Sequence, residues 1–128
     1  MVSAVTEGVK VSVEVFYQPE YSHPLKGEYI FNYRVKIENF SPNTLRLMRR
    51  HWFIFDSNGI AQEVEGDGVV GKQPIIEPAQ SHAYISGCHL NSEMGRMSGY
   101  YEMQRVSDGA PMRIEIPAFN LIAPFKLN

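Results

Sequence analysis

The segment from Gly66 to Lys72 is the part of the sequence that best matches a known ligand-binding motif, and it reads Gly-Asp-Gly-Val-Val-Gly-Lys. This order fits both the G-x-G-x-x-G pattern of dinucleotide-binding turns and the G-x-x-x-x-G-K pattern of phosphate-binding loops. Both motifs bind phosphate at the N-terminus of a helix that begins at the last glycine. Here Gln73 replaces the Ser or Thr that would hold magnesium, and Pro74 and Pro78 oppose a helix. The helix-based phosphate site is therefore incomplete.

We call residues Gly66 to Gln73 the glycine loop, and two interpretations of it stay open. In the first, it is a connection between strands in which Gly66, Gly68 and Gly71 allow positive φ or a close approach of the backbone. In the second, successive backbone N–H groups form a weaker anion site to which Lys72 adds charge. The second interpretation predicts binding of pyrophosphate or a nucleotide.

A second candidate site is the basic stretch from Arg46 to His51, in which four of the six residues are Arg or His. In an extended strand, Arg50 and Trp52 share one face and Arg49 and His51 share the other. Neither face is purely polar. This pattern indicates a bulge near Arg49 and Arg50, or a cation buried beside an aromatic ring.

The basic stretch also has a structural and a functional interpretation. Structurally, we expect guanidinium groups on Trp52 or tyrosine faces, paired with acids such as Glu63 or Glu65. Functionally, Arg and Trp are common at the centres of protein interfaces. We therefore predict that Arg50, His51 and Trp52 form a binding surface together with the glycine loop.

The remaining reactive side chains form no recognisable catalytic or metal-binding pattern in the sequence. Cys88 and His89 are adjacent and point to opposite sides of a strand, so they cannot both bind one ion without a turn. Ser86 is not in the G-x-S-x-G elbow of hydrolases. We predict no catalytic residues, no metal ligands and no cofactor, and hence a protein that is not an enzyme.

The composition limits the class of protein. The chain has 128 residues, 12 basic and 14 acidic side chains and 44% hydrophobic residues, which predicts one domain over residues 1–128. A net charge of −2 argues against nucleic-acid binding. The longest apolar run, Trp52 to Phe55, is far shorter than the roughly 20 residues of a membrane helix. One cysteine and an N-terminus without a secretory signal predict a cytoplasmic protein.

Hydrophobic residues alternate with polar ones along most of the chain, as in half-buried strands. The runs that show this are Val9 to Tyr17, Tyr29 to Ile37, Thr44 to Asp56, Ile60 to Glu65, Ser81 to Gly87, Met97 to Met103 and Met112 to Leu121, with a short strand expected at Ile75-Ile76. Seven to eight such strands predict an all-β fold, an antiparallel β-sandwich of the immunoglobulin or fibronectin type III kind, with a barrel as the alternative.

Three details of this pattern are specific. Asn58-Gly59 predicts a two-residue type I′ hairpin turn. At Pro117 the alternation reverses its phase, which indicates an edge or a bulge. The strand from Val9 to Tyr17 has no assigned outer neighbour, so a homodimer formed through it stays open.

Several motifs occur in a distinctive order: Arg50-His51-Trp52, the glycine loop followed by Pro74, Ser86-Gly87, and Ile116-Pro117. In this order the chain resembles the bacterial ApaG family, also called CorD, from about Val9 to Pro124. The resemblance implies a fibronectin type III-like sandwich, a protein-interaction role, and an association with cobalt and magnesium phenotypes. It brings no catalytic residues. We therefore expect a non-enzymatic module that binds a protein partner, with binding of pyrophosphate or a nucleotide at the glycine loop as the alternative.

Overall fold

The alternating hydrophobic pattern folds as nine strands in the computed structural model, which describes residues 1–124. The only helical segment in this range is a 3₁₀ turn at Pro24–Lys26. No helix among the described residues is long and apolar enough to cross a membrane. Residues 125–128 of the predicted domain lie outside the described residues. The strands are β1 (Val2–Thr6), β2 (Val9–Tyr17), β3 (Tyr29–Asn39), β4 (Leu45–Asp56), β5 (Ala61–Asp67), β6 (Ile75–Ile76), β7 (Ser81–Leu90), β8 (Met94–Arg105) and β9 (Pro111–Ile122).

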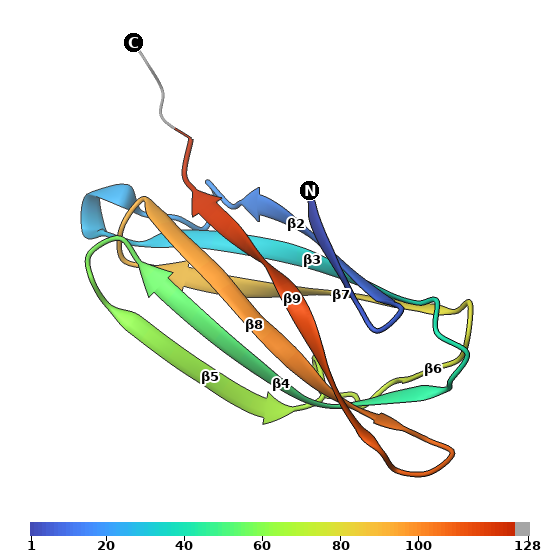
Figure 1. Cartoon of the computed structure of the whole chain (residues 1–128). Helices are drawn as coiled ribbons and strands as arrows, with labels where there is room; N and C mark the ends of the chain where they lie inside the picture. Colours follow the sequence, from blue (N-terminus) through green and yellow to red (C-terminus); the bar gives the residue numbers. More distant parts are fainter. Residues whose placement is uncertain (125–128) are drawn as a thin grey trace.

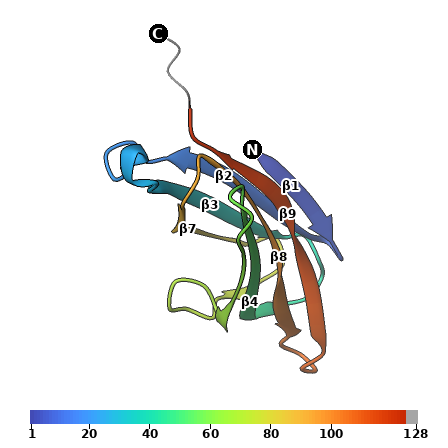
Figure 2. The ribbon, with the colours of Figure 1, turned by 90° about the vertical axis from the view of Figure 1, so that its left-hand side faces the viewer.

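The strands form two antiparallel sheets packed face to face (Figure 1). One sheet has the order β1-β2-β3-β7, and the other has the order β5-β4-β8-β9, with β6 paired to the beginning of β4. On one side of the sandwich β9 lies against β1 and β2 (Figure 2). On the other side the glycine loop faces β7. The predicted all-β antiparallel sandwich is confirmed.

The core between the sheets is built from alternate positions of the strands, as a period of two requires. The ring of Tyr33 on β3 contacts that of Trp52 on β4 edge to face, with centroids 5.4 Å apart. The ring of Phe119 on β9 lies 5.8 Å from Tyr33 and 5.9 Å from Trp52. Three strands from two sheets therefore meet at this aromatic group, and Trp52, predicted at a binding surface, is a buried core residue.

A bulge in β4 decides which residues of the basic stretch face the core. The register of β4 against β8 breaks between Leu47 and Arg49, so Met48 is the extra residue. Leu47 is buried before the bulge and Trp52 after it, although their positions differ by an odd number of residues. The bulge predicted near Arg49 and Arg50 is confirmed. It turns Arg50 toward the space between the sheets and Arg49 toward the outside.

The hairpin between β4 and β5 differs from the predicted type I′ turn. Asp56 N–H donates to the Ile60 carbonyl at 2.9 Å, which leaves three residues in the loop instead of two. Gly59 has φ of 96°, whereas Asn58 is not among the residues with positive φ. The Asn58 side-chain oxygen accepts from Ile60 N–H at 3.0 Å, and this side-chain bond favours the wider loop. The prediction was therefore wrong by one residue in loop length.

The sequence suggested that the strand from Val9 to Tyr17 lies at the edge of a sheet. In the structure it does not. β1 pairs along it from Val2 opposite Val13 to Thr6 opposite Val9, and β3 pairs on its other side. Because β2 is paired on both sides, it has no free edge through which a homodimer could form. The bulge predicted at Pro117 is confirmed, because the register of β8 against β9 shifts between Met97 and Gly99.

Candidate functional site

The glycine loop connects β5 to β6 beside the bulge of β4. The carbonyl of Met48 accepts from the backbone N–H of Gly68 at 2.9 Å and from the side-chain amide of Gln73 at 3.0 Å. A bulge leaves backbone groups without their usual partners in the sheet. Gly68 and Gln73 supply those partners, so Gln73 holds the glycine loop against β4.

The tip of the glycine loop is a tight turn of four residues. Val69 and Lys72 exchange two backbone hydrogen bonds, of 2.8 and 3.0 Å. Val70 has φ of 47° and Gly71 has φ of 74°, as in a type I′ turn. No helix begins after Gly71 within the described residues. The N–H groups of Gly68, Val69 and Lys72 already donate within the protein, which weakens the interpretation as a phosphate nest.

Gly66 makes room for Arg50, its cross-strand neighbour. A Cβ atom on Gly66 would lie 2.7 Å from a terminal nitrogen of the Arg50 guanidinium. Arg50 Nη1 donates to the carbonyls of Asp67 and Gly68, at 3.0 Å each. The first interpretation of the glycines, as sites of positive φ or close approach, is confirmed for Gly66, Gly68 and Gly71.

Beneath this turn lies a pocket of about 210 Å³ between the two sheets. We call it the Arg50 pocket. It brings the guanidinium of Arg50 together with the hydroxyl-bearing residues Tyr33, Tyr84 and Ser86. Among the described residues, Arg50 has no carboxylate within ion-pair distance. The walls of the pocket are completed by Trp52, Val69, Val70, Gly71 and Ile85.

The buried tyrosines of the Arg50 pocket and of the core behind it remain protonated near neutral pH. Burial raises the pKa of Tyr33, Tyr84 and Tyr101, and the charge of Arg50 opposes this shift in each. The hydroxyls of Tyr84 and Tyr101 are hydrogen-bonded to each other. The pocket thus presents a cation and hydroxyl groups, and this combination binds the oxygens of an anion.

The Cys88 thiol on β7 is also protonated at neutral pH. Burial, followed by the charge of Asp56, raises the pKa of Cys88 to about 11. A thiol is a nucleophile only as the thiolate. Cys88 therefore offers little nucleophilic character near pH 7.

The structure separates the residues predicted to form one site. Arg50 and Trp52 line the Arg50 pocket, whereas Lys72 and Gln73 line a neighbouring hollow of about 470 Å³ with Arg46. The Lys72 side chain also lies near His82, whose pKa is lowered first by burial and then by Lys72. Three residues of the pocket were not predicted from the sequence: Tyr33, Tyr84 and Ser86.

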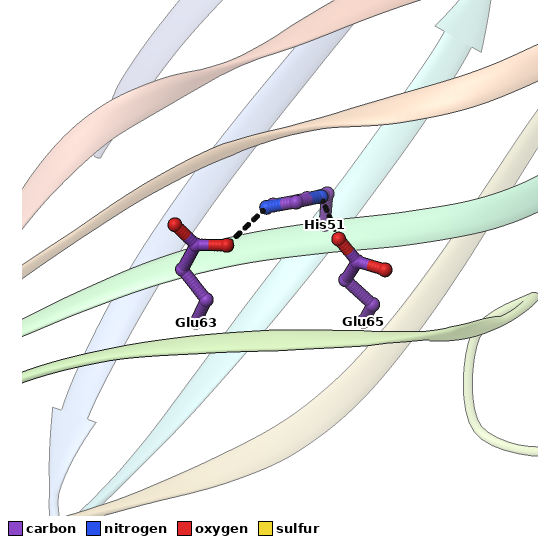
Figure 3. A group of neighbouring side chains, drawn as sticks. All are labelled: His51, Glu63 and Glu65. Carbon is purple, nitrogen blue, oxygen red and sulfur yellow. Dashed lines mark ion pairs between the residues drawn. The ribbon is translucent and has the colours of Figure 1, made fainter.

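His51 points away from the Arg50 pocket, to the outer face of the β5-β4-β8-β9 sheet. Its ring stacks on Tyr100 with centroids 4.8 Å apart and lies 4.7 Å from the ring of Phe53. Glu63 and Glu65 on β5 approach its two nitrogens (Figure 3). No metal ligands were predicted from the sequence, and these three residues were not grouped there. The register of the β4–β5 hairpin, which places Glu65 opposite His51, is the signal that could have found them.

The arginines of the basic stretch match the prediction in part. Arg49 contacts Asp67 at 2.6 Å and Glu65 at 3.7 Å, so the expected pairing with Glu65 is present. Among the described residues the cation–π contact is made by Arg113, whose guanidinium lies 3.9 Å from the centroid of Tyr100. Within the described part of the chain, and contrary to the prediction from the sequence, no guanidinium group stacks on Trp52, because aromatic rings of the core enclose Trp52.

Known proteins resemble this chain over most of its length. The ApaG domain family matches residues 19–105. Protein ApaG of Brucella abortus (strain S19) is 50% identical over 124 residues, which cover 97% of this chain and 95% of that protein. Protein ApaG of Brucella anthropi is 46% identical with the same coverage.

Two solved structures share the fold. A Bordetella pertussis protein described as ApaA superposes with a TM-score of 0.87 at 38% identity, over 92% of this chain and 95% of that one. A structural genomics target solved by X-ray crystallography gives a TM-score of 0.86 at 37% identity, over 94% of this chain and 90% of that one. By the family match and by identity along nearly the whole sequence, this chain belongs to the ApaG family.

Proposed function

We propose that this protein is a non-catalytic binding module whose Arg50 pocket takes an acidic group of a protein partner. The observation that carries the proposal is the guanidinium of Arg50, which lies in a pocket between the sheets without a carboxylate partner among the described residues. Charged groups removed from water are normally paired. An acidic side chain or a C-terminal carboxylate of a partner supplies the missing charge, and the hydroxyls of Tyr33, Tyr84 and Ser86 can donate to its oxygens.

The size of the pocket favours a group of a larger molecule over a free nucleotide. Pockets that enclose drug-sized ligands measure about 300–1,000 Å³. The Arg50 pocket, at about 210 Å³, has room for a carboxylate or one phosphate group and not for a nucleoside as well. The rest of a nucleotide would therefore lie outside it.

The rim of the pocket favours a protein partner. Val70 is 62% exposed and Ile85 is 58% exposed, and both line the pocket. Val70 also holds a backbone conformation that is unfavourable for a β-branched residue. Such strain is found where a side chain serves a function. A cationic centre with an apolar rim matches an acidic residue flanked by apolar ones.

Selection from a phage-displayed library of random peptides tests this proposal. We expect selected peptides to carry Asp or Glu next to apolar residues. We expect Arg50→Gln to weaken their binding at least tenfold in fluorescence anisotropy. Arg46→Gln, which removes an exposed cation outside the pocket, should change binding less than twofold.

Two results would overturn the proposal. One is a selection without acidic enrichment. The other is equal peptide binding by wild type and a folded Arg50→Gln variant, with folding checked by NMR. Because Arg50 also bonds the loop backbone, Val70→Asn serves as a second variant, which leaves those bonds intact and should weaken binding by removing an apolar contact.

A second candidate function is binding of pyrophosphate or of a nucleotide through its phosphates. The observation that favours it is the neighbouring hollow, where Lys72 and Arg46 add two cations next to the Arg50 pocket. Calorimetric titration with pyrophosphate, ATP and diadenosine tetraphosphate, with and without Mg²⁺, tests it. Binding that is lost in Lys72→Gln supports this function, and flat traces at millimolar ligand exclude it.

A further inference from the structure

His51 on the outer sheet face has carboxylates at both of its ring nitrogens (Figure 3). Glu65 Oε1 lies 2.9 Å from Nδ1, and Glu63 Oε2 lies 3.4 Å from Nε2. The Tyr100 hydroxyl also lies 3.2 Å from Nδ1. A neutral imidazole that binds a metal ion through Nε2 carries its proton on Nδ1, which is the side of the Glu65 carboxylate.

Nε2 of His51 is left without a hydrogen-bond partner. It is a buried side-chain atom for which the described part of the chain provides none, although the Glu63 carboxylate is near. The whole side chain is only 14% exposed. In the neutral imidazole with its proton on Nδ1, the lone pair of Nε2 faces this second carboxylate, and two acceptors repel each other unless a proton or a metal ion lies between them. A buried, unsatisfied polar atom of this kind requires an explanation such as a bound ion.

The separation of the two atoms fits a metal ion. Zinc binds histidine nitrogen and carboxylate oxygen at about 2.0–2.2 Å with tetrahedral angles, which places two such ligands about 3.4 Å apart. Nε2 and Glu63 Oε2 have this separation. His51, Glu63 and Glu65 each offer a ligand atom, and these atoms lie within 4.8 Å of one another. The site is therefore close to a metal-binding geometry before any side chain moves.

We propose that His51 Nε2 and the Glu63 carboxylate bind a divalent transition-metal ion of the zinc class. Glu65 positions the imidazole through Nδ1–H, as carboxylates commonly do for metal-binding histidines. Glu63 is 65% exposed, so water can complete the coordination from the solvent side. A mixed nitrogen and carboxylate set suits zinc or nickel better than magnesium, which prefers oxygen alone. This site lies on the opposite side of β4 from the Arg50 pocket and is independent of the function proposed above.

Isothermal titration of the full chain with Zn²⁺, in a buffer that does not bind metal, tests the proposal. We expect one ion per chain, with binding abolished in His51→Gln and weakened at least tenfold in Glu63→Gln. Glu65→Gln should weaken binding about tenfold, because it removes the group that orients the imidazole. Mg²⁺ should give no binding under the same conditions.

Matched controls separate this site from incidental binding. Glu115→Gln removes an exposed carboxylate from the same sheet face, and His89→Gln removes an exposed histidine elsewhere. Neither should change Zn²⁺ affinity more than twofold. In ¹⁵N NMR of the imidazoles, Zn²⁺ should shift Nε2 of His51 before any other histidine nitrogen.

The proposal is overturned if wild type binds no Zn²⁺ at 1 mM, or if Glu63→Gln binds it as tightly as wild type. It is also overturned if another histidine responds first. Glu63 is exposed at the surface of β5, so Glu63→Gln should fold normally. The test therefore stays decisive even if His51→Gln fails to fold.

Discussion

The guanidinium of Arg50 lies over the backbone of Gly66 on the neighbouring strand, where a Cβ atom would come within 2.7 Å of it. From there Nη1 bonds two carbonyls of the glycine loop. Gly66, the first glycine of the nucleotide-binding pattern, therefore leaves space for an arginine side chain of the protein itself. The motif and the basic stretch, which are separate in sequence, form one structural unit.

Replacing Gly66 by alanine should destabilise the protein by about 1–3 kcal/mol, because the methyl group overpacks against Arg50. Urea unfolding measures this loss. In an Arg50→Ala background the same substitution should cost clearly less, since its neighbour is gone. Gly71→Ala is the control: a Cβ there meets no atom within 4 Å, so only the positive φ opposes it, at about 1 kcal/mol. Equal losses from Gly66→Ala in both backgrounds would contradict this account.

Val70→Asn should raise the free energy of unfolding by about 1 kcal/mol. Val70 holds φ of 47°, and asparagine tolerates this region much better than a β-branched residue. Thermal unfolding gives the shift in Tm. Val106→Asn, at an exposed valine outside the positive-φ region, should give no gain. If Val70→Asn gained stability and retained full peptide binding, strain at Val70 would have no part in recognition.

Asn39→Ala should cost about 3 kcal/mol, because it leaves several buried backbone groups unpaired. Asn39 Nδ2 donates to the carbonyls of Asn43 at 2.7 Å and Ile76 at 2.9 Å, and its Oδ1 accepts from Ser41 N–H at 3.0 Å. Chemical denaturation measures the loss. Asn120→Ala, at an exposed position of β9, should stay within about 0.5 kcal/mol of wild type. A loss below 1 kcal/mol for Asn39→Ala would show that water replaces these bonds.

The Cys88 thiol should react slowly with Ellman's reagent at pH 8 and rapidly once the protein is unfolded in urea. Its pKa is raised from 9.0 to about 11 in the folded protein, so the unfolded chain loses this proton first as the pH rises. Stability from Cys88 is therefore complete below pH 9.0 and is lost as the pH rises toward about 11. Cys88→Ala should remove that part of the alkaline pH dependence. Rapid labelling of the folded protein at pH 8 would contradict the burial of this thiol.

The fold was predictable because hydrophobic and polar residues alternate along nearly every strand. This pattern can be recognised from the local sequence alone. β3 is the clearest case, with Tyr33, Val35 and Ile37 buried between polar neighbours. β1 was missed because its five residues are largely exposed, and so carry no clear hydrophobic alternation. The β4–β5 turn was misjudged because Asn-Gly suits more than one loop length, and a side-chain hydrogen bond of Asn58 selected the longer one.

The candidate site was only half predictable. Arg50 and the glycine loop stand out by residue type, but the groups that complete the Arg50 pocket do not. Tyr33 and Ser86 lie opposite each other on β3 and β7, far apart in the sequence, and only the pairing of these strands brings them together. A tyrosine in a strand is ordinarily a core residue, so no local pattern distinguishes Tyr33 or Tyr84.

The bulge at Met48 determines which side chains of β4 face the core. Because it takes up one extra residue, Leu47 and Trp52 both face the core, while His51 stays outside with its glutamates. In a regular strand of the same sequence, His51 and Phe53 would turn inward and Arg50 outward, which would abolish the pocket and the histidine cluster together. Deletion of Met48 would leave a regular strand with both faces in place, so the two sites depend on the local shape of the backbone at this point and not on the length of β4.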